Sequence, residues 1–65
     1  MNIKKLQGIL AEKDYTKEKL AKEMGIDRST IYRKFKSQNF TLKEAREIKR
    51  ILQISDQMAN IIFFS

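Results

Sequence analysis

The chain contains no cysteine, histidine, proline or tryptophan, and it has only two glycines among 65 residues. Without cysteine no disulfide can stabilise the fold, and without cysteine and histidine the usual zinc and transition-metal ligand sets are excluded. A chain of this length forms one small domain, expected to span residues 1–65. Stability must therefore come from apolar packing, helix capping and association with other chains, and we expect no metal and no cofactor.

Long apolar runs are also missing. No stretch approaches the ~20 residues that a membrane span needs, and the first residues, "MNIKKLQGIL", lack the apolar core of a signal peptide. The absence of cysteine is consistent with a cytoplasmic protein. We expect no membrane partner.

Positive charge is what the sequence has in excess. Fourteen Lys and Arg face eight Asp and Glu, which gives a net charge of +6 and an isoelectric point of about 9.8. A small basic domain favours a polyanionic partner, nucleic acid before an acidic membrane surface or protein. The alternative is a basic domain with no anionic partner.

Apolar residues at three- and four-residue spacing, with no proline, predict five short helices and a compact all-α domain. The helices are expected over residues 3–12, 17–24, 28–36, 42–52 and 56–64. Capping residues precede four of them, and Gly25 suits the left-handed conformation that ends the second. The predicted caps are Thr16, Asp27, Thr41 (in a capping box with Glu44) and Ser55.

Two packing details follow from the same pattern. Gly8 lies inside the first helix, where a glycine costs ~1 kcal/mol relative to alanine, so we expect another helix to approach it closely. The helix over residues 42–52 should bury a stripe of five apolar side chains, which are Leu42, Ala45, Ile48, Ile51 and Leu52.

The segment "KEKLAKEMGIDRSTIYRKFK", residues 17–36, holds the most specific motif. A small residue at Ala21, a turn at Gly25 and a branched apolar residue at Ile31 let two short helices meet at a steep angle. With Leu20 and Ile26, these residues resemble the helix-turn-helix of the Cro and phage-repressor family, often called the XRE family. The resemblance implies a lambda-repressor-like DNA-binding fold of four or five helices.

The third predicted helix should have two faces. Ile31 and Phe35 point to the core, and the opposite side carries forked donors, a hydroxyl and a ring that suit a major groove. In the family, the first turn and middle of this helix read bases, which implies base-reading roles for Arg28, Ser29, Tyr32 and Arg33. By position Asp27 is also included, but it is better explained as the helix cap.

Each assignment has a structural alternative. The arginines could be solvated charges, Ser29 could simply favour a first helical turn, and the Tyr32 ring could pack against the second helix. Lys34 is expected to lie aside from the groove as a solvated or remote charge.

Phosphate contacts need donors at helix ends. The family anchors a phosphate where the second helix begins, and it often places a basic residue near the start of the fourth. Lysines in a first turn oppose the helix dipole, a cost that an external anion relieves. The expected phosphate-contacting residues are Thr16, Lys17, Lys36, Ser37, Asn39 and Lys43, with ordinary surface lysines as the alternative.

The C-terminal "IIFF", which is Ile61, Ile62, Phe63 and Phe64, cannot all point into one core because the four residues are consecutive. They could close the core, form a dimer seam or dock a partner protein. We expect some to cover the core and others to pair two subunits. Members of the resembled family usually bind inverted repeats as two-fold dimers, with half-sites about 34 Å apart.

These features predict a sequence-specific double-stranded-DNA-binding transcription regulator. The resemblance, and the lack of room in the chain for a sensor domain, suggest a Cro-like repressor of a phage or mobile element, acting on an inverted-repeat operator in the bacterial nucleoid or phage-infected cell. No small-molecule ligand is expected. The alternative is a protein-interaction module, anti-repressor or antitoxin-like, that uses the apolar C-terminus.

Catalysis is poorly supported. There is no histidine or cysteine, and no serine lies in a strained elbow or glycine-rich loop. Glu44 and Glu47, near Lys43, Arg46 and Arg50, are expected to be solvated salt-bridge partners. We therefore expect no enzyme activity.

Overall fold

Each helix begins after a residue whose side chain accepts a backbone hydrogen bond from the first turn. In the computed structural model, which describes residues 1–64, the caps are Asn2, Thr16, Asp27, Thr41 and Ser55. Each satisfies an N–H group that has no partner inside the helix, which stabilises by about 1 kcal/mol. The four predicted caps are thereby confirmed, and Asn2 is a fifth.

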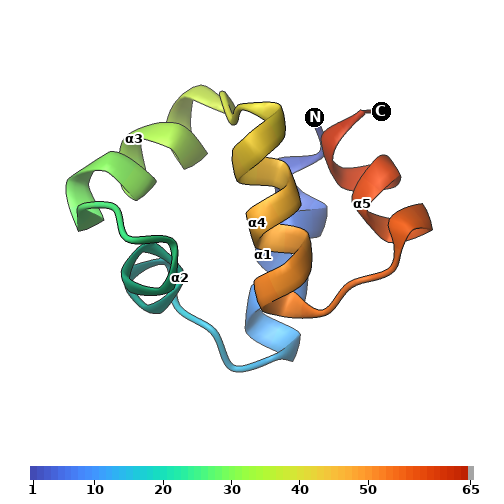
Figure 1. Ribbon diagram of the computed structural model, residues 1–65, viewed down its shortest axis with the longest axis horizontal. Helices are drawn as coiled ribbons and strands as arrows, with labels where there is room; N and C mark the ends of the chain where they lie inside the picture. Colours follow the sequence, from blue (N-terminus) through green and yellow to red (C-terminus); the bar gives the residue numbers. More distant parts are fainter. Residues whose placement is uncertain (65) are drawn as a thin grey trace.

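Residues 1–64 contain five helices and no strand (Figure 1), which confirms the predicted all-α fold. The predicted domain extends one residue further, to Ser65, which lies outside the described residues. The helices are α1 (Ile3–Glu12), α2 (Lys17–Met24), α3 (Arg28–Ser37), α4 (Leu42–Leu52) and α5 (Asp56–Phe63).

The capping box of α4 is present as predicted. The Glu44 backbone N–H donates to the Thr41 hydroxyl at 3.1 Å, and the Thr41 backbone N–H donates to the Glu44 carboxylate at 2.8 Å. Two backbone donors are thus satisfied reciprocally. This arrangement sets where α4 begins after the loop that follows α3.

Helices α2, α3 and α4 each end at a C-cap residue in the left-handed conformation. Gly25, after α2, has φ +75°, as expected of a residue without a Cβ. Gln38 after α3 and Gln53 after α4 adopt φ +55° and +53° respectively. Residues other than glycine and asparagine are strained in this conformation. The backbone conformations of Gln38 and Gln53 therefore lower the stability of the fold somewhat.

The core is a single cluster to which every helix contributes. The fully buried large side chains are Leu6, Leu20, Ile31, Ile48, Leu52 and Ile62. Three aromatic rings extend the cluster, because Phe40 meets Phe35 and Phe63 edge-to-face at centroid distances of 5.4 and 6.4 Å. The loop after α3 is thereby packed against both α3 and α5.

Two of the packing predictions are wrong. No atom from another part of the fold lies within 4 Å of a Cβ built on Gly8, so no helix approaches it closely. Leu42 is 53% exposed, because the first turn of α4 extends past the edge of the core. The rest of the predicted stripe is buried, apart from half-buried Ile51.

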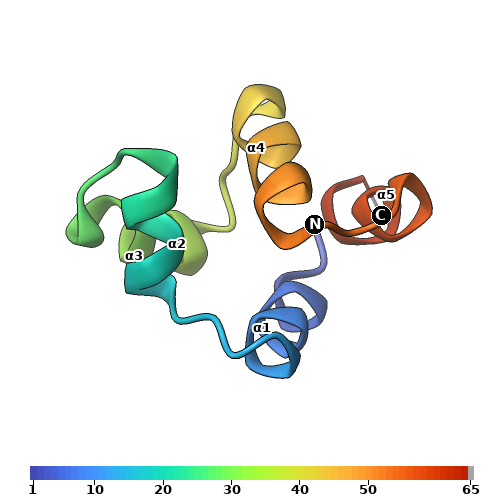
Figure 2. The same ribbon diagram turned by 60° about the horizontal axis from the view of Figure 1, so that its bottom comes forward.

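The two ends of the molecule have different architectures (Figures 1 and 2). Helices α2 and α3 cross at one end, α5 lies at the other, and α1 and α4 lie between them. The backbone N–H of Asn2 donates to the Ile62 carbonyl at 2.6 Å, which fixes the start of α1 against α5. The helix-turn-helix pair forms one end of the molecule and shares the core with the remaining helices.

Candidate nucleic-acid interface

Helix α3 separates an apolar face from a basic one. Ile31 and Phe35 are buried at 0% and 4% exposure, and both belong to the same core cluster as Leu20 of α2. The opposite face is open to solvent because helical periodicity directs its side chains away from the core. Its exposed residues are Arg28, Ser29, Tyr32, Arg33 and Lys36.

Arg28 and Tyr32 are held from α2 by a residue that the sequence analysis missed. Glu18 Oε2 accepts a hydrogen bond from Arg28 Nη2 at 3.1 Å and a second from the Tyr32 hydroxyl. The guanidinium of Arg28 also lies over the Tyr32 ring, 5.8 Å from its centroid. Tyr32 therefore contacts the second helix while remaining 40% exposed. No local spacing rule finds Glu18, because its partners lie on another helix.

The ammonium group of Lys17 also lies against aromatic rings. Its Nζ atom is 4.9 Å from the Phe35 centroid and 5.7 Å from the Tyr32 centroid. These cation–π contacts offset part of the cost of a cation in the first turn of α2. Thr16, just before it, accepts the Lys19 backbone N–H at 3.0 Å, so its hydroxyl hydrogen stays available as a donor.

Asp27 is the cap of α3, as the sequence analysis favoured. Its carboxylate accepts hydrogen bonds from the Ser29 hydroxyl and from the Ser29 backbone N–H, the latter at 3.0 Å. These bonds stabilise the ionised form and lower the pKa of Asp27, with a smaller contribution from Arg28. The Ser29 hydroxyl is thus already engaged within the first turn of its own helix.

The end of α3, the loop after it and the first turn of α4 also present polar residues toward solvent. Lys36, Ser37, Asn39 and Lys43 are all exposed. The Asn39 backbone N–H donates to the Lys34 carbonyl at 3.2 Å, which closes the turn at the end of α3. The side chains of Lys36, Asn39 and Lys43 lie where α3 ends and α4 begins, as the phosphate-contact prediction requires.

Lys34 does not behave as predicted. It was expected to be a solvated or remote charge, but its Nζ atom lies 3.0 Å from Glu44 Oε2, and the two side chains are only 21% and 17% exposed. Glu44 is likewise no solvated partner of its neighbours on α4. The pair joins α3 to α4, a contact between helices that a single-helix pattern does not report.

The C-terminal residues divide between the core and the surface. Ile62 is fully buried, so it is no part of an interaction surface, and Phe63 is half-buried against Phe40. Ile61 and Phe64 are 41% and 65% exposed. The prediction that some of the four cover the core is confirmed.

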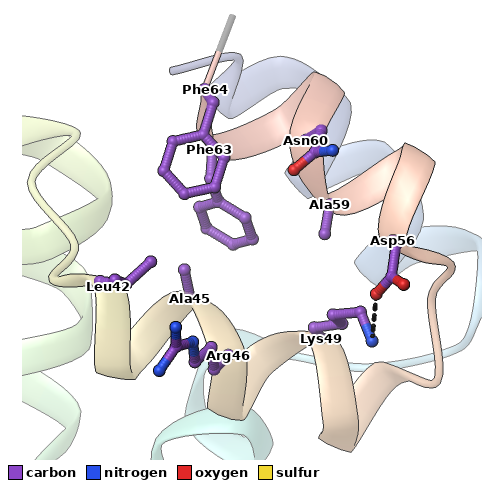
Figure 3. Close-up of a pocket in the computed structure, with 9 residues that line it drawn as sticks. All are labelled: Leu42, Ala45, Arg46, Lys49, Asp56, Ala59, Asn60, Phe63 and Phe64. Carbon is purple, nitrogen blue, oxygen red and sulfur yellow. Dashed lines mark ion pairs between the residues drawn. The ribbon is translucent and has the colours of Figure 1, made fainter.

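An open groove runs between α4 and α5, beside the exposed ring of Phe64 (Figure 3). Its walls combine apolar side chains with polar and charged ones, and the ion pair between Lys49 Nζ and Asp56 Oδ1, 2.8 Å apart, closes one end. The lining residues are Leu42, Ala45, Arg46, Lys49, Asp56, Ala59, Asn60, Phe63 and Phe64.

Residues 1–64 contain no group of three or more acidic residues placed to hold a metal ion. None of the helices in that range is long and apolar enough to cross a membrane.

One protein family matches nearly the whole chain. The family described as the helix-turn-helix of insertion element transposase matches residues 1–63, which include all five helices. No curated protein and no solved structure matches significantly. The crossed helices α2 and α3, the exposed basic face of α3 and this match agree on a helix-turn-helix DNA-binding domain. The chain belongs to the family of insertion element transposase helix-turn-helix domains.

Proposed function

We propose that the chain recognises a specific duplex DNA sequence by inserting α3 into the major groove. The observation that carries this proposal is the division of α3 into a buried apolar face and an exposed face with Arg28, Tyr32 and Arg33. An arginine can donate two parallel hydrogen bonds to guanine O6 and N7, a pair worth ~1–3 kcal/mol of discrimination. Arg28 and Arg33 are the main readers, supported by Tyr32 and Ser29.

Phosphate contacts flank this face and set the register of α3 in the groove. Thr16 and Lys17 lie where α2 begins, and the remaining donors lie between the end of α3 and the first turn of α4. Lys17 reaches a phosphate by exchanging its ring contacts for an ion pair. The other proposed phosphate-contacting residues are Lys36, Ser37, Asn39 and Lys43.

The proposed role is that of a Cro-like transcription regulator of a phage or mobile element, which represses by occupying a promoter. The family match supports a second role, that of the DNA-recognition part of a transposase-like protein. Both roles use the same face of α3. They differ in where the bound sequence lies: within a promoter, or at an end of a mobile DNA segment.

The proposed DNA complex is a two-fold dimer. One reading helix limits specificity, and a second copy doubles the bases that are read. The exposed side chains of Leu42 and Phe64, beside the groove between α4 and α5, form the proposed contact with the second copy. Helix α5, which forms one wall of this groove, lies at the end of the molecule opposite to α2 and α3 (Figure 2).

Enrichment from a random duplex library at about physiological salt tests the proposal, because screening removes most non-specific attraction. We expect an inverted repeat whose half-sites are about one helical turn apart. A single enriched site would retain the DNA recognition and remove the dimer. If no sequence were enriched, sequence-specific recognition would be wrong, and a protein-interaction role for the apolar C-terminus would take its place.

The two arginines are expected to carry selectivity. Arg28→Ala and Arg33→Ala should each lower the affinity for the enriched duplex by ~1–3 kcal/mol. They should weaken binding to a shuffled duplex much less, as measured by fluorescence anisotropy. Lys4→Ala and Lys5→Ala on α1 remove the same charge from exposed positions and are the matched controls. Equal losses on the two duplexes would contradict the assignment of the arginines as base readers.

A further inference from the structure

A single carboxylate joins α2 to the proposed reading face of α3. One oxygen, Glu18 Oε2, accepts from Arg28 Nη2 at 3.1 Å and from the Tyr32 hydroxyl. The Glu18 side chain is 39% exposed and that of Arg28 is 70% exposed, so the carboxylate is partly shielded while the guanidinium projects to solvent. Glu18 therefore lies just behind two groups that are proposed to meet the DNA.

We propose that Glu18 is a specificity-determining positioning residue, which orients Arg28 and Tyr32 for base recognition and disfavours binding to other sequences. This inference rests on the proposed function, because it assigns Glu18 a role in the same interface. Glu18 acts through its two partners and contacts no base itself.

Orientation is the first part of the effect. A free arginine side chain has about 2 kcal/mol of rotamer entropy to lose when it is fixed. The bond to Glu18 and the contact with the Tyr32 ring already restrict Arg28 in the free protein. A guanidinium has five N–H donors, so one bond to Glu18 leaves enough donors for a bidentate contact with guanine. Part of the cost of ordering Arg28 is therefore met before DNA binds.

Charge is the second part. The Glu18 carboxylate lies in the first turn of α2, next to Lys17 and near the expected phosphates. Its negative charge opposes every duplex equally, and it reduces the charge with which Arg28 attracts any phosphate. The hydrogen bonds between Arg28 and a matching base edge compensate for this weaker attraction, and other sequences offer no such bonds. Glu18 thus weakens non-specific binding more than specific binding.

The Tyr32 ring connects the parts of this arrangement. Lys17 Nζ and the Arg28 guanidinium carbon lie 5.7 and 5.8 Å from its centroid, and its hydroxyl is bound to Glu18. Release of the hydroxyl frees the ring to turn, and both cations lose a fixed neighbour. The geometry therefore couples Glu18 to Lys17 as well as to Arg28.

The test compares Glu18→Gln and Glu18→Ala with the parent chain on the enriched duplex and on a shuffled duplex, across a salt series. Both variants should bind the shuffled duplex about two- to threefold more tightly, because a negative charge is lost from the interface. The ratio of specific to non-specific affinity should fall about tenfold for Glu18→Ala, because Arg28 and Tyr32 lose their acceptor. Glu12→Gln, at an exposed position where α1 ends, makes the same charge change and should leave the ratio unchanged.

A second readout concerns the free protein. Nitrogen relaxation at Arg28 Nε should report a more mobile guanidinium in Glu18→Ala than in the parent chain, while thermal unfolding by circular dichroism checks that the variant folds. If the parent chain discriminates between the two duplexes and Glu18→Ala has the same ratio of specific to non-specific affinity, this inference alone would be overturned. A parent chain that does not discriminate between duplexes would overturn the proposed function and, with it, this inference. An unchanged mobility of Arg28 would also contradict the positioning role.

Discussion

At the scale of single residues, the carboxylates act mainly by fixing other groups. Asp27 caps α3, Glu18 binds two side chains of α3, and Glu44 both closes a capping box and pairs with Lys34. Asp56 pairs with Lys49, and that hydrogen bond and charge lower the pKa of Asp56. Four of the eight acidic residues of this basic chain thus lie where helices begin or meet.

Glu44 gives the clearest dependence of stability on pH. Burial by itself would raise the pKa of Glu44, but bonds from the Thr41 backbone and Lys34 together outweigh it, and the pKa is lowered from its ordinary value of 4.5. Since the folded pKa lies below the unfolded one, the ionised group stabilises the fold above about pH 4.5. That stabilisation is lost as the pH falls through the folded pKa.

We therefore expect Glu44→Gln to lower the free energy of unfolding by about 1 kcal/mol at pH 7, through the weakened capping box and lost ion pair. At pH 3 the difference between the variant and the parent chain should be smaller than at pH 7, because protonation of Glu44 removes its charge. Urea unfolding at the two pH values measures this. A difference of equal size at pH 7 and pH 3 would show that the charge of Glu44 is unimportant.

At the scale of helices, the two glycines differ in backbone conformation: Gly8 lies inside a helix, and Gly25 ends one. Gly8 lies in the middle of α1, is exposed, and has open space where a Cβ would be. Gly25 also has open space around it, but its φ of +75° is unfavourable for any residue with a side chain. Backbone conformation, and not crowding, therefore separates the two sites.

The same substitution should have opposite effects at these glycines. Gly8→Ala should raise the free energy of unfolding by about 0.5–1 kcal/mol, because alanine is favoured in a helix and meets nothing. Gly25→Ala should lower it by about 1 kcal/mol or more, because φ remains positive. Thermal unfolding of the two variants compares them directly, each serving as the control for the other. Stabilisation by both would indicate that the turn between α2 and α3 is free to change its conformation.

At the scale of the whole molecule, the proposed dimer contact and the reading face of α3 lie on different helices, although Leu42 of the dimer contact adjoins Lys43 of the proposed phosphate contacts. Helices α2 and α3 form one end and α5 the other, with α1 and α4 between them (Figure 1). A second copy that contacts the groove between α4 and α5 would leave both copies of α3 uncovered. The proposed dimer therefore leaves α3 available for the proposed contact with DNA.

The consecutive residues at the end of α5 should separate folding from dimer formation. Ile62→Val should lower the free energy of unfolding by about 1 kcal/mol, because a methyl group leaves a fully buried site. Phe64→Ala should change it by less than about 0.5 kcal/mol, because the ring is 65% exposed. Phe64→Ala should instead reduce the preference for two half-sites over one in a band-shift titration. An unchanged preference would place the dimer contact elsewhere.

Much of this protein could be predicted from local sequence. Thr16, Asp27, Thr41 and Ser55 cap helices because a short polar side chain binds N–H groups two or three residues away, and Gly25 ends α2 because of its own backbone freedom. The two faces of α3 follow from the period of the helix alone. In each case the interacting groups are close in sequence, so the chain pattern is sufficient.

Contacts between helices were decided by the tertiary structure. The pairing of Lys34 with Glu44, the attachment of Arg28 and Tyr32 to Glu18, and the position of Lys17 over Phe35 depend on how α2, α3 and α4 cross. Exposure of Leu42 and burial of Ile62 depend on where the core ends. Local pattern determines which residues share a helix face, whereas the neighbour that this face meets depends on packing among helices distant in sequence.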